Sequence, residues 1–156
     1  MAEDYPAVAI HAYKRFIKLK PDKSLDYLDF LLRNDLLKEA LSFYVDLLEM
    51  KELPFASKLK SRLELWLELS EFVAKYPSRA QSLKTPADTL IRYAIAKYPE
   101  EAGRLWIFLA DYYSRLGYFG KARDVFEEAL AQLTSVKDFG VIFNAYMKFE
   151  EAMLDS

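Results

Sequence analysis

The stretch that decides the fold is LWIFLADYYSRLGYFGKARDVFEEAL, residues 105–130. At helical spacing it reads as two amphipathic helices, with large rings on the first and small residues between rings on the second, and the break between them falls at Gly117. The stretch therefore predicts a helical hairpin. Because two helices alone cannot bury so many leucine, tyrosine and phenylalanine side chains, we expect the hairpin to stack against copies of itself.

The copies are found along the rest of the chain, as bulky residues spaced three positions apart. The packing residues expected in first helices are Tyr27 and Phe30; Trp66, Leu69 and Phe72; Trp106, Leu109 and Tyr112; and Phe143, Tyr146 and Phe149. Those expected in the second helix of the quoted hairpin are Ala122, Phe126 and Ala129. Trp66 and Trp106 are 40 residues apart, and Trp106 and Phe143 are 37 apart. Paired helices with a period of about 40 residues predict an all-α solenoid.

Prolines and short polar runs divide the expected solenoid into helix pairs. We expect one array over residues 1–156, a right-handed superhelix of about eight helices. Its parts are an unpaired second helix at 5–20, repeats at 22–52, 58–98 and 100–134, and an unpaired first helix at 137–154. Since the pattern starts and stops within a repeat, the chain is expected to be a segment of a longer array, and its exposed ends could pair two copies.

Composition places the chain among folded proteins and provides few residues for chemistry. Apolar residues make up 53% of the sequence and charged residues 29%, and the formal net charge is −2. The chain has no cysteine and one histidine, His11, so neither a zinc-ligand set nor a nucleophile with a neighbouring base can be assembled. No apolar run approaches the ~20 residues of a membrane span. We therefore expect no catalytic residue, no metal, no cofactor and no membrane partner.

Two families of helical repeats fit the quoted hairpin. Most residues that a tetratricopeptide repeat requires are present, namely Trp106, Leu109, Ala110, Tyr113, Ala122, Phe126 and Ala129. The closing proline of that repeat, however, would fall at Thr134, and its period is ~34 residues. The longer and variable period, with Tyr146-x-x-Phe149-Glu150 in a first helix and Ala122-Arg123 in a second, resembles the half-a-tetratricopeptide (HAT) repeat of RNA-processing scaffolds.

Among HAT proteins the resemblance narrows to one family. The quoted stretch, together with Tyr13-Lys14-Arg15-Phe16, Leu65-Trp66 and Thr134-x-Val136-x-Asp138-Phe139, is similar to the pre-mRNA splicing factors of the Syf-one type, also called XPA-binding proteins. This resemblance implies a nuclear, non-catalytic scaffold of the spliceosome, in the Prp-nineteen-associated or intron-binding complex. Its implied partners include an Isy-type factor and an Aquarius-type helicase. The alternative is a tetratricopeptide-like peptide-binding module, or a HAT scaffold of another RNA-processing complex.

Two groups of charged residues are candidates for contact with partners. The first group lies on second helices, which are expected to line a concave face where a helix or an extended peptide could dock; it contains Arg92, Lys121 and Asp124. The second group belongs to a basic cluster that could contact RNA phosphates; it contains Lys14, Arg15 and Lys18. The plainer interpretation of the basic cluster is a solvated outer face.

The HAT repeat that the chain resembles has an arginine beside a small residue, and here this arginine is Arg123, in the pair Ala122-Arg123. We expect it to form an ion pair with an acidic residue of the neighbouring helix, Glu150 or Glu151. Contact with a partner protein is the alternative interpretation.

Overall fold

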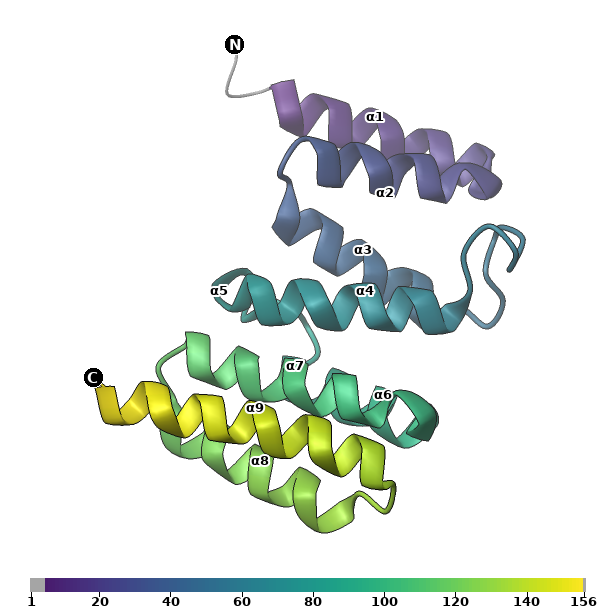
Figure 1. The fold of residues 1–156 in the computed structure, drawn as a ribbon. Coiled ribbons are helices and arrows are strands. Elements are labelled where there is room, and N and C mark those ends of the chain that lie inside the picture. The colour runs from purple at the N-terminus through teal and green to yellow at the C-terminus, as the bar shows by residue number, and fades with distance from the viewer. Residues whose placement is uncertain (1–4, 156) are drawn as a thin grey trace. The chain divides into compact units, whose positions relative to one another are not determined.

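The computed structural model describes residues 5–155, and most of them are helical. These residues form nine α-helices, two short 3₁₀ turns and no strand, which confirms the predicted all-α class (Figure 1). The elements are α1 Tyr5–Leu19, η1 Pro21–Lys23, α2 Ser24–Arg33, α3 Leu37–Glu49, α4 Arg62–Lys75, α5 Pro77–Ala80, α6 Ala87–Lys97, η2 Pro99–Glu101, α7 Ala102–Arg115, α8 Phe119–Gln132 and α9 Val136–Asp155. No helix in this range is long and apolar enough to cross a membrane.

The chain divides into two compact units, the first ending at Leu65 and the second beginning at Trp66. In the first unit, α2 packs against both α1 and α3. Tyr27 of α2 and Tyr44 of α3 are almost completely buried. Tyr13 of α1 stacks on Tyr27 and Phe30, with ring centroids 5.4 Å and 4.8 Å apart. Aromatic contacts of this kind stabilise beyond the area that they bury, so rings join α1 to the core of this unit.

The loop between α3 and α4 is closed by Arg62, the first residue of α4. Its guanidinium donates hydrogen bonds to the carbonyls of Leu48 (3.2 Å), Met50 (2.5 Å) and Lys51 (2.9 Å). Carbonyls at the end of a helix have no partner within the helix, and a cation there is favoured by the helix dipole. Arg62 therefore caps α3, where many helices use a glycine.

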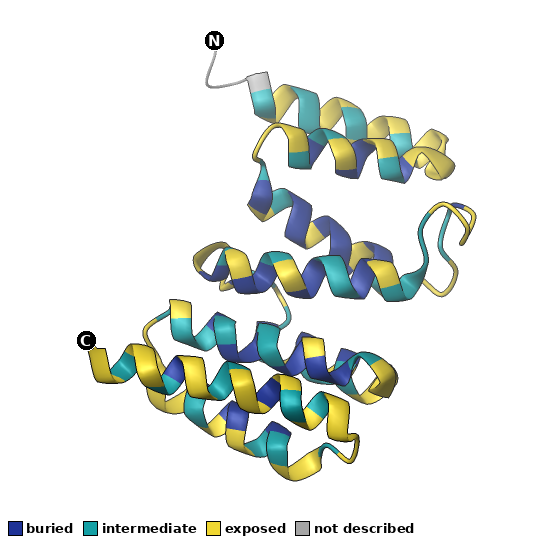
Figure 2. Ribbon diagram, viewed as in Figure 1, coloured by how far each residue is buried: buried dark blue, intermediate teal, exposed yellow. Residues whose placement is uncertain are grey.

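The second unit is organised around α7. This helix contacts α5, α6, α8 and α9, and Figure 1 shows α7, α8 and α9 lying along one another. Leu105, Leu109 and Ala110 of α7 are completely buried, and Figure 2 shows the buried residues recurring along the helices of this unit. This spacing is the helical periodicity from which the hairpin was predicted.

The turn between α7 and α8 depends on Gly117, as predicted from the break in the pattern. Gly117 has a φ of 85°, in the left-handed region that glycine adopts without strain. The N–H of Gly117 donates to the carbonyl of Ser114 (3.0 Å), and the N–H of Tyr118 donates to that of Tyr113 (2.9 Å). These two bonds satisfy carbonyls at the end of α7, which is how a left-handed residue ends a helix.

One short helix in the second unit lies between α4 and α6, the two long helices of the repeat predicted at 58–98. Pro77–Ala80 forms α5, with Pro77 at its first position. Proline suits that position because its φ is already helical and it has no N–H to leave unpaired.

Candidate interaction surfaces

Most of the predicted packing residues are buried between helices. Those at most 8% exposed are Tyr27, Trp66, Leu69, Trp106, Leu109, Tyr112, Ala122, Phe126, Ala129 and Phe149. Those of intermediate exposure are Phe30, Phe72 and Tyr146. Ring contacts account for several of them: Phe126 of α8 stacks on Tyr146 of α9 at 5.2 Å, and Trp66 lies 5.3 Å from Tyr93.

Phe143 differs from this prediction, because its side chain is 43% exposed. The face of α9 that meets α7 and α8 carries Ile142 and Phe149, which are buried. Phe143 follows Ile142 by one residue and therefore points about 100° away from it. There it stacks on Phe139 of the same helix, with centroids 6.1 Å apart. Phe143 thus lies on an outer face of α9 together with Phe139 and Met147.

Arg92 lies at the centre of a polar network that joins three helices. Its Nε donates to Oδ1 of Asp88 on α6 (2.7 Å), and its Nη1 donates to Oε2 of Glu128 on α8 (2.7 Å). The hydroxyl of Tyr113, from α7, donates to Oδ2 of Asp88 (2.5 Å). The guanidinium also lies over the ring of Trp106, 5.5 Å from its centroid. A side chain predicted to face a partner is therefore already bound within the chain.

The pKa values of Arg92 and Tyr113 favour the hydrogen bonds that these two side chains donate. Hydrogen bonding to Glu128, and then to Asp88, raises the pKa of Arg92 above its ordinary value, against the opposing effect of burial. Burial first, and then the hydrogen bond to Asp88, raises the pKa of Tyr113. Arg92 therefore stays charged and Tyr113 stays protonated as a donor throughout the neutral range.

Arg123 forms the ion pair that the sequence predicts. Its Nε lies 2.7 Å from Oε1 of Glu150, so it links α8 to α9, and its guanidinium lies over the ring of Phe149 at 5.8 Å. On the same pair of helices the hydroxyl of Tyr146 donates to Glu127 (3.0 Å). The α8–α9 contact thus has both an Arg–Glu pair and a Tyr–carboxylate bond. Around Arg92 the same two interactions are divided, with the Arg–Glu pair between α6 and α8 and the Tyr–carboxylate bond between α6 and α7.

Lys121 and Asp124, the other two candidates on second helices, are both exposed on α8. The ammonium of Lys121 lies over the rings of Tyr113 and Tyr118, 5.5 Å and 5.7 Å from their centroids. Lys121 lines a hollow of about 370 Å³ that Asp88 and Tyr113 also line. The Arg92 network and Lys121 therefore meet at one place, while participation of Asp124 in partner binding stays a prediction.

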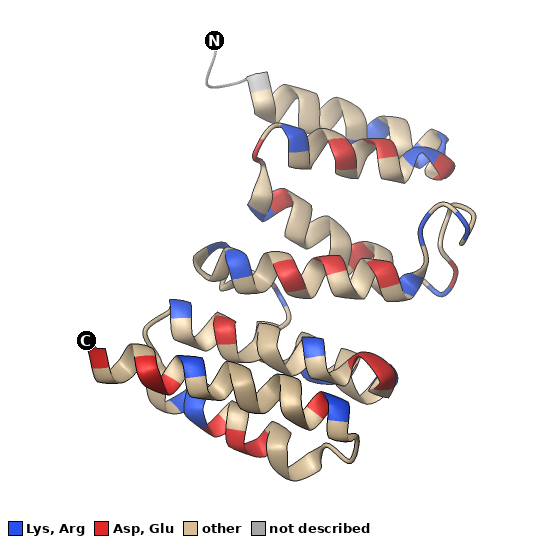
Figure 3. Ribbon diagram, viewed as in Figure 1, with Lys and Arg blue, Asp and Glu red and all other residues tan. Residues whose placement is uncertain are grey.

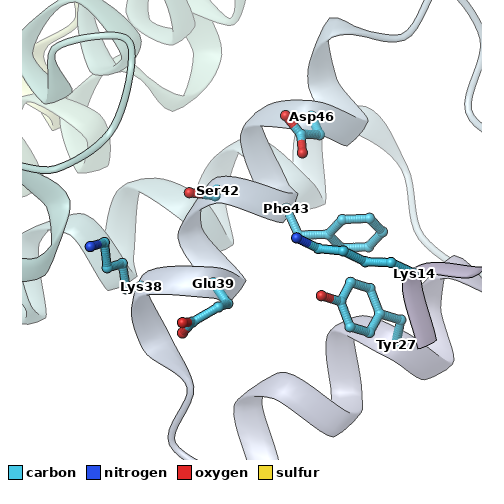
Figure 4. A pocket seen from close by; sticks show the side chains of 7 residues that line it. All are labelled: Lys14, Tyr27, Lys38, Glu39, Ser42, Phe43 and Asp46. Atoms are coloured by element: carbon cyan, nitrogen blue, oxygen red, sulfur yellow. The ribbon is translucent and has the colours of Figure 1, made fainter. Parts of the chain in front are cut away.

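Lys14 lines a pocket of the first unit with residues of α2 and α3. The pocket has a volume of about 170 Å³, and the side chains of Lys14, Tyr27 and Phe43 point toward one another in it (Figure 4). Two carboxylates, Glu39 and Asp46, share the lining. Burial first, and then these two charges, raises the pKa of Tyr27 to about 12. The surroundings of Lys14 are therefore of mixed charge rather than purely basic.

Arg15 and Lys18 are exposed on α1. Figure 3 shows acidic residues on α2, the neighbouring helix of the same unit. One of them, Asp29, is paired with Arg33 at 2.9 Å. Such interspersed charges weaken the long-range attraction for phosphate that a uniform patch would exert. Contact of Lys14, Arg15 and Lys18 with RNA stays a prediction.

A further hollow, here called the Trp106 groove, lies beside α7 in the second unit. Its volume is about 510 Å³, and its lining includes Ile95, Ala96, Glu100, Trp106, Leu133 and Asp138. A smaller hollow of about 150 Å³ shares Ile95, Ala96 and Trp106 with it and extends to Arg92 and Glu128. Sequence reasoning found Trp106 as a packing residue but not this groove, because its walls come from segments that are far apart in the chain.

Sequence reasoning also missed Asp88, Tyr113 and Glu128 as partners in a network. The spacing of Asp88 and Arg92, four residues apart on a helix, is a signal for an ion pair. Glu128 is 36 residues from Arg92, and no local pattern indicates that contact. His11 is exposed on α1, and within residues 5–155 no three His, Asp or Glu side chains are grouped so that they could hold a metal ion.

Comparison with known proteins gives consistent matches over both units. The family described as the middle HAT repeat of pre-mRNA-splicing factor SYF1 matches residues 25–156. Over 150 residues the chain is 39% identical to pre-mRNA-splicing factor SYF1 of Homo sapiens, a match that covers 96% of this chain and 17% of that protein. It is 38% identical over 153 residues to the syf1 homolog of Drosophila melanogaster, covering 97% and 17%. It is 35% identical over 156 residues to cwf3 of Schizosaccharomyces pombe, covering 99% and 19%. The chain therefore spans about a fifth of the length of these relatives.

Proposed function

Since the chain belongs to the family of SYF1 pre-mRNA-splicing factors, as their middle HAT repeat, we propose that it acts in pre-mRNA splicing as a non-catalytic scaffold for other proteins. The observation that carries this proposal is the identity of 39% over 150 residues to a protein named as a splicing factor. The match runs along nearly the whole chain, so it includes the helices of both units.

The distribution of aromatic side chains between the interior and the surface supports a scaffold function. The bulky rings lie between helices, where each buries a large apolar area. The outer surface keeps exposed rings, such as Tyr93 and Tyr118, beside charged side chains. Exposed aromatic residues are enriched where proteins bind one another, because they provide contact area at little cost in conformational entropy.

The proposed setting is the nucleus, in the Prp-nineteen-associated or intron-binding complex of the spliceosome. The proposed partners are an Isy-type factor, an Aquarius-type helicase and other proteins of that complex. The names of the complex and of the partners come with the family resemblance. The relatives are named as pre-mRNA-splicing factors, which supports a role in splicing.

Affinity purification from nuclear extract, with the 156-residue chain as bait, tests this function. We expect splicing proteins to be recovered above an empty-resin control. The extract should be divided and one half treated with ribonuclease, because loss of the signal would mean that RNA bridges the proteins rather than that the chain binds them. Recovery of chaperones without splicing proteins would instead support the tetratricopeptide-like peptide-binding alternative.

A further inference from the structure

We propose that the Trp106 groove binds a partner segment in which an apolar side chain is flanked by Lys or Arg. This inference rests on the proposed scaffold function, and it adds the chemical class of one partner and the place where it binds. The groove lies wholly within the second unit, between α6, the start of α7 and the segment that joins α8 to α9.

The shape and lining of the groove suit an apolar side chain. Trp106 forms part of the lining, and Ile95 of α6 and Leu133, just after α8, add partly exposed aliphatic surface. Ala96 is exposed at the groove and has a side chain too small to fill it. A hollow of about 510 Å³ falls within the usual size range of ligand sites, and polar side chains such as Gln132, Thr134 and Ser135 line it beside the apolar ones.

The charge of the lining determines which neighbours that apolar side chain should have. Glu100 and Asp138 line the groove, and no Lys or Arg is among the described residues that do so. Arg92, in the adjoining smaller hollow, is already bonded to Asp88 and Glu128. The lining therefore keeps negative charge, of which the partial positive charge at the start of α7 offsets only a part.

The carboxylate of Asp138 lies close to the first turn of α7. A Cβ placed on Gly103, in the first turn of α7, would lie only 3.1 Å from Oδ1 of Asp138. Glycine at this position thus leaves room for the carboxylate beside the groove. Glu100, by contrast, is exposed on η2 and can reach a cation at the mouth. Complementary charges of this kind chiefly determine which partner is accepted and how fast it associates.

The test uses Trp106 as its own reporter. In the full chain carrying Trp66→Phe, tryptophan emission comes from Trp106 alone, since the sequence has two tryptophans. The probe is a short peptide in which two leucines are flanked by lysines, and its counterpart has glutamates in place of the lysines. We expect the lysine peptide to change the emission in a saturable way, with affinity about tenfold or more above that of the glutamate peptide, and to weaken as salt increases.

Two variants test whether the peptide binds in the Trp106 groove. Ala96→Phe should abolish the change by filling the hollow, and Glu100→Gln should weaken the lysine peptide several-fold without changing the fold. The matched control is Glu151→Gln, an exposed carboxylate on α9 outside the groove, which should leave the affinity unchanged. Equal affinity for both peptides, or binding of the lysine peptide that Ala96→Phe does not affect, would overturn the proposal.

Failure of this inference can be told apart from failure of the scaffold function. If Ala96→Phe and the parent chain recover the same splicing proteins from nuclear extract, the Trp106 groove is not their binding site while the scaffold function stands. If the parent chain recovers no splicing protein, the scaffold function fails, and the peptide titration still reports on the groove by itself.

Discussion

The bridge from Arg92 to Glu128 gives the sharpest test of how the second unit is held together. We expect Arg92→Met to destabilise this unit, because methionine keeps an apolar stem but cannot bond to Glu128 or Asp88. Tyr113 would still donate to Asp88 after the change, so part of the network should survive.

The size of the effect follows from the contacts and from their exposure. A hydrogen bond between charged groups contributes about 1.5–3 kcal/mol when well buried, whereas exposed ion pairs contribute about 0–1 kcal/mol. The side chains of Arg92 and Glu128 are each 37% exposed, which places the pair between these cases. We expect a coupling energy of about 1 kcal/mol between them, and a total loss of about 2 kcal/mol for Arg92→Met once the Asp88 pair and the stacking on Trp106 are included.

The assay is a double-mutant cycle measured by urea unfolding, with Arg92→Met, Glu128→Gln and the double variant. The matched control is Arg104→Met, which removes an arginine that is 57% exposed and 3.7 Å from its carboxylate partner. That change should stay within about 0.5 kcal/mol of the parent. If the effects of Arg92→Met and Glu128→Gln add to within about 0.3 kcal/mol, the bridge does not stabilise the unit and the reasoning is refuted.

Three further predictions concern other parts of the chain. Arg62→Ala should destabilise the first unit by about 1–2 kcal/mol, because it leaves the carbonyls at the end of α3 uncapped. The control is Lys58→Ala, at an exposed position in the same loop, and equal urea midpoints for the two variants would contradict the capping role. Phe149→Ala should cost about 3–5 kcal/mol and Phe143→Ala less than about 1 kcal/mol, since the first side chain is 8% exposed and the second 43%; similar losses on thermal unfolding would mean that the outer face of α9 is covered in solution. The free energy of unfolding should fall as the pH rises from 10 toward 12, because the pKa of Tyr27 is near 10.0 in the unfolded chain but about 12 in the folded one, so the unfolded chain loses this proton first. Tyr27→Phe should make this fall shallower in urea titrations, and an unchanged slope would contradict the raised pKa.

The helices were predictable because their causes are local. The three-residue spacing of rings around Trp106, and the left-handed glycine at 117, each act within one or two turns of chain. The ion pair of Arg123 with Glu150 was also foreseen, because consecutive helices of a repeat array are neighbours even where one repeat ends and the next begins. The all-α class and these contacts therefore follow from patterns that can be read along the sequence.

The interaction surfaces were harder to predict because their causes are not local. Arg92 was expected to face a partner, yet Glu128, 36 residues away, bonds to it. Phe143 has the spacing of a packing residue, but its burial depends on which helix covers that face of α9. Arg62 caps a helix whose last residue precedes it by 13 positions, so this contact is not a local one. Each case required knowledge of which segments meet in space.

The central place of α7 has a consequence for how the second unit opens. The amide protons of Leu105 and Leu109 can reach solvent only if α6, α8 or α9 first moves aside, since these helices all contact α7. In deuterated water the backbone of α7 should therefore exchange last, at the rate of global unfolding of the unit, whereas the last turn of α9, with Leu154 85% exposed, should exchange by fraying. Any loss of α7 would then release the surrounding helices together, as one cooperative block.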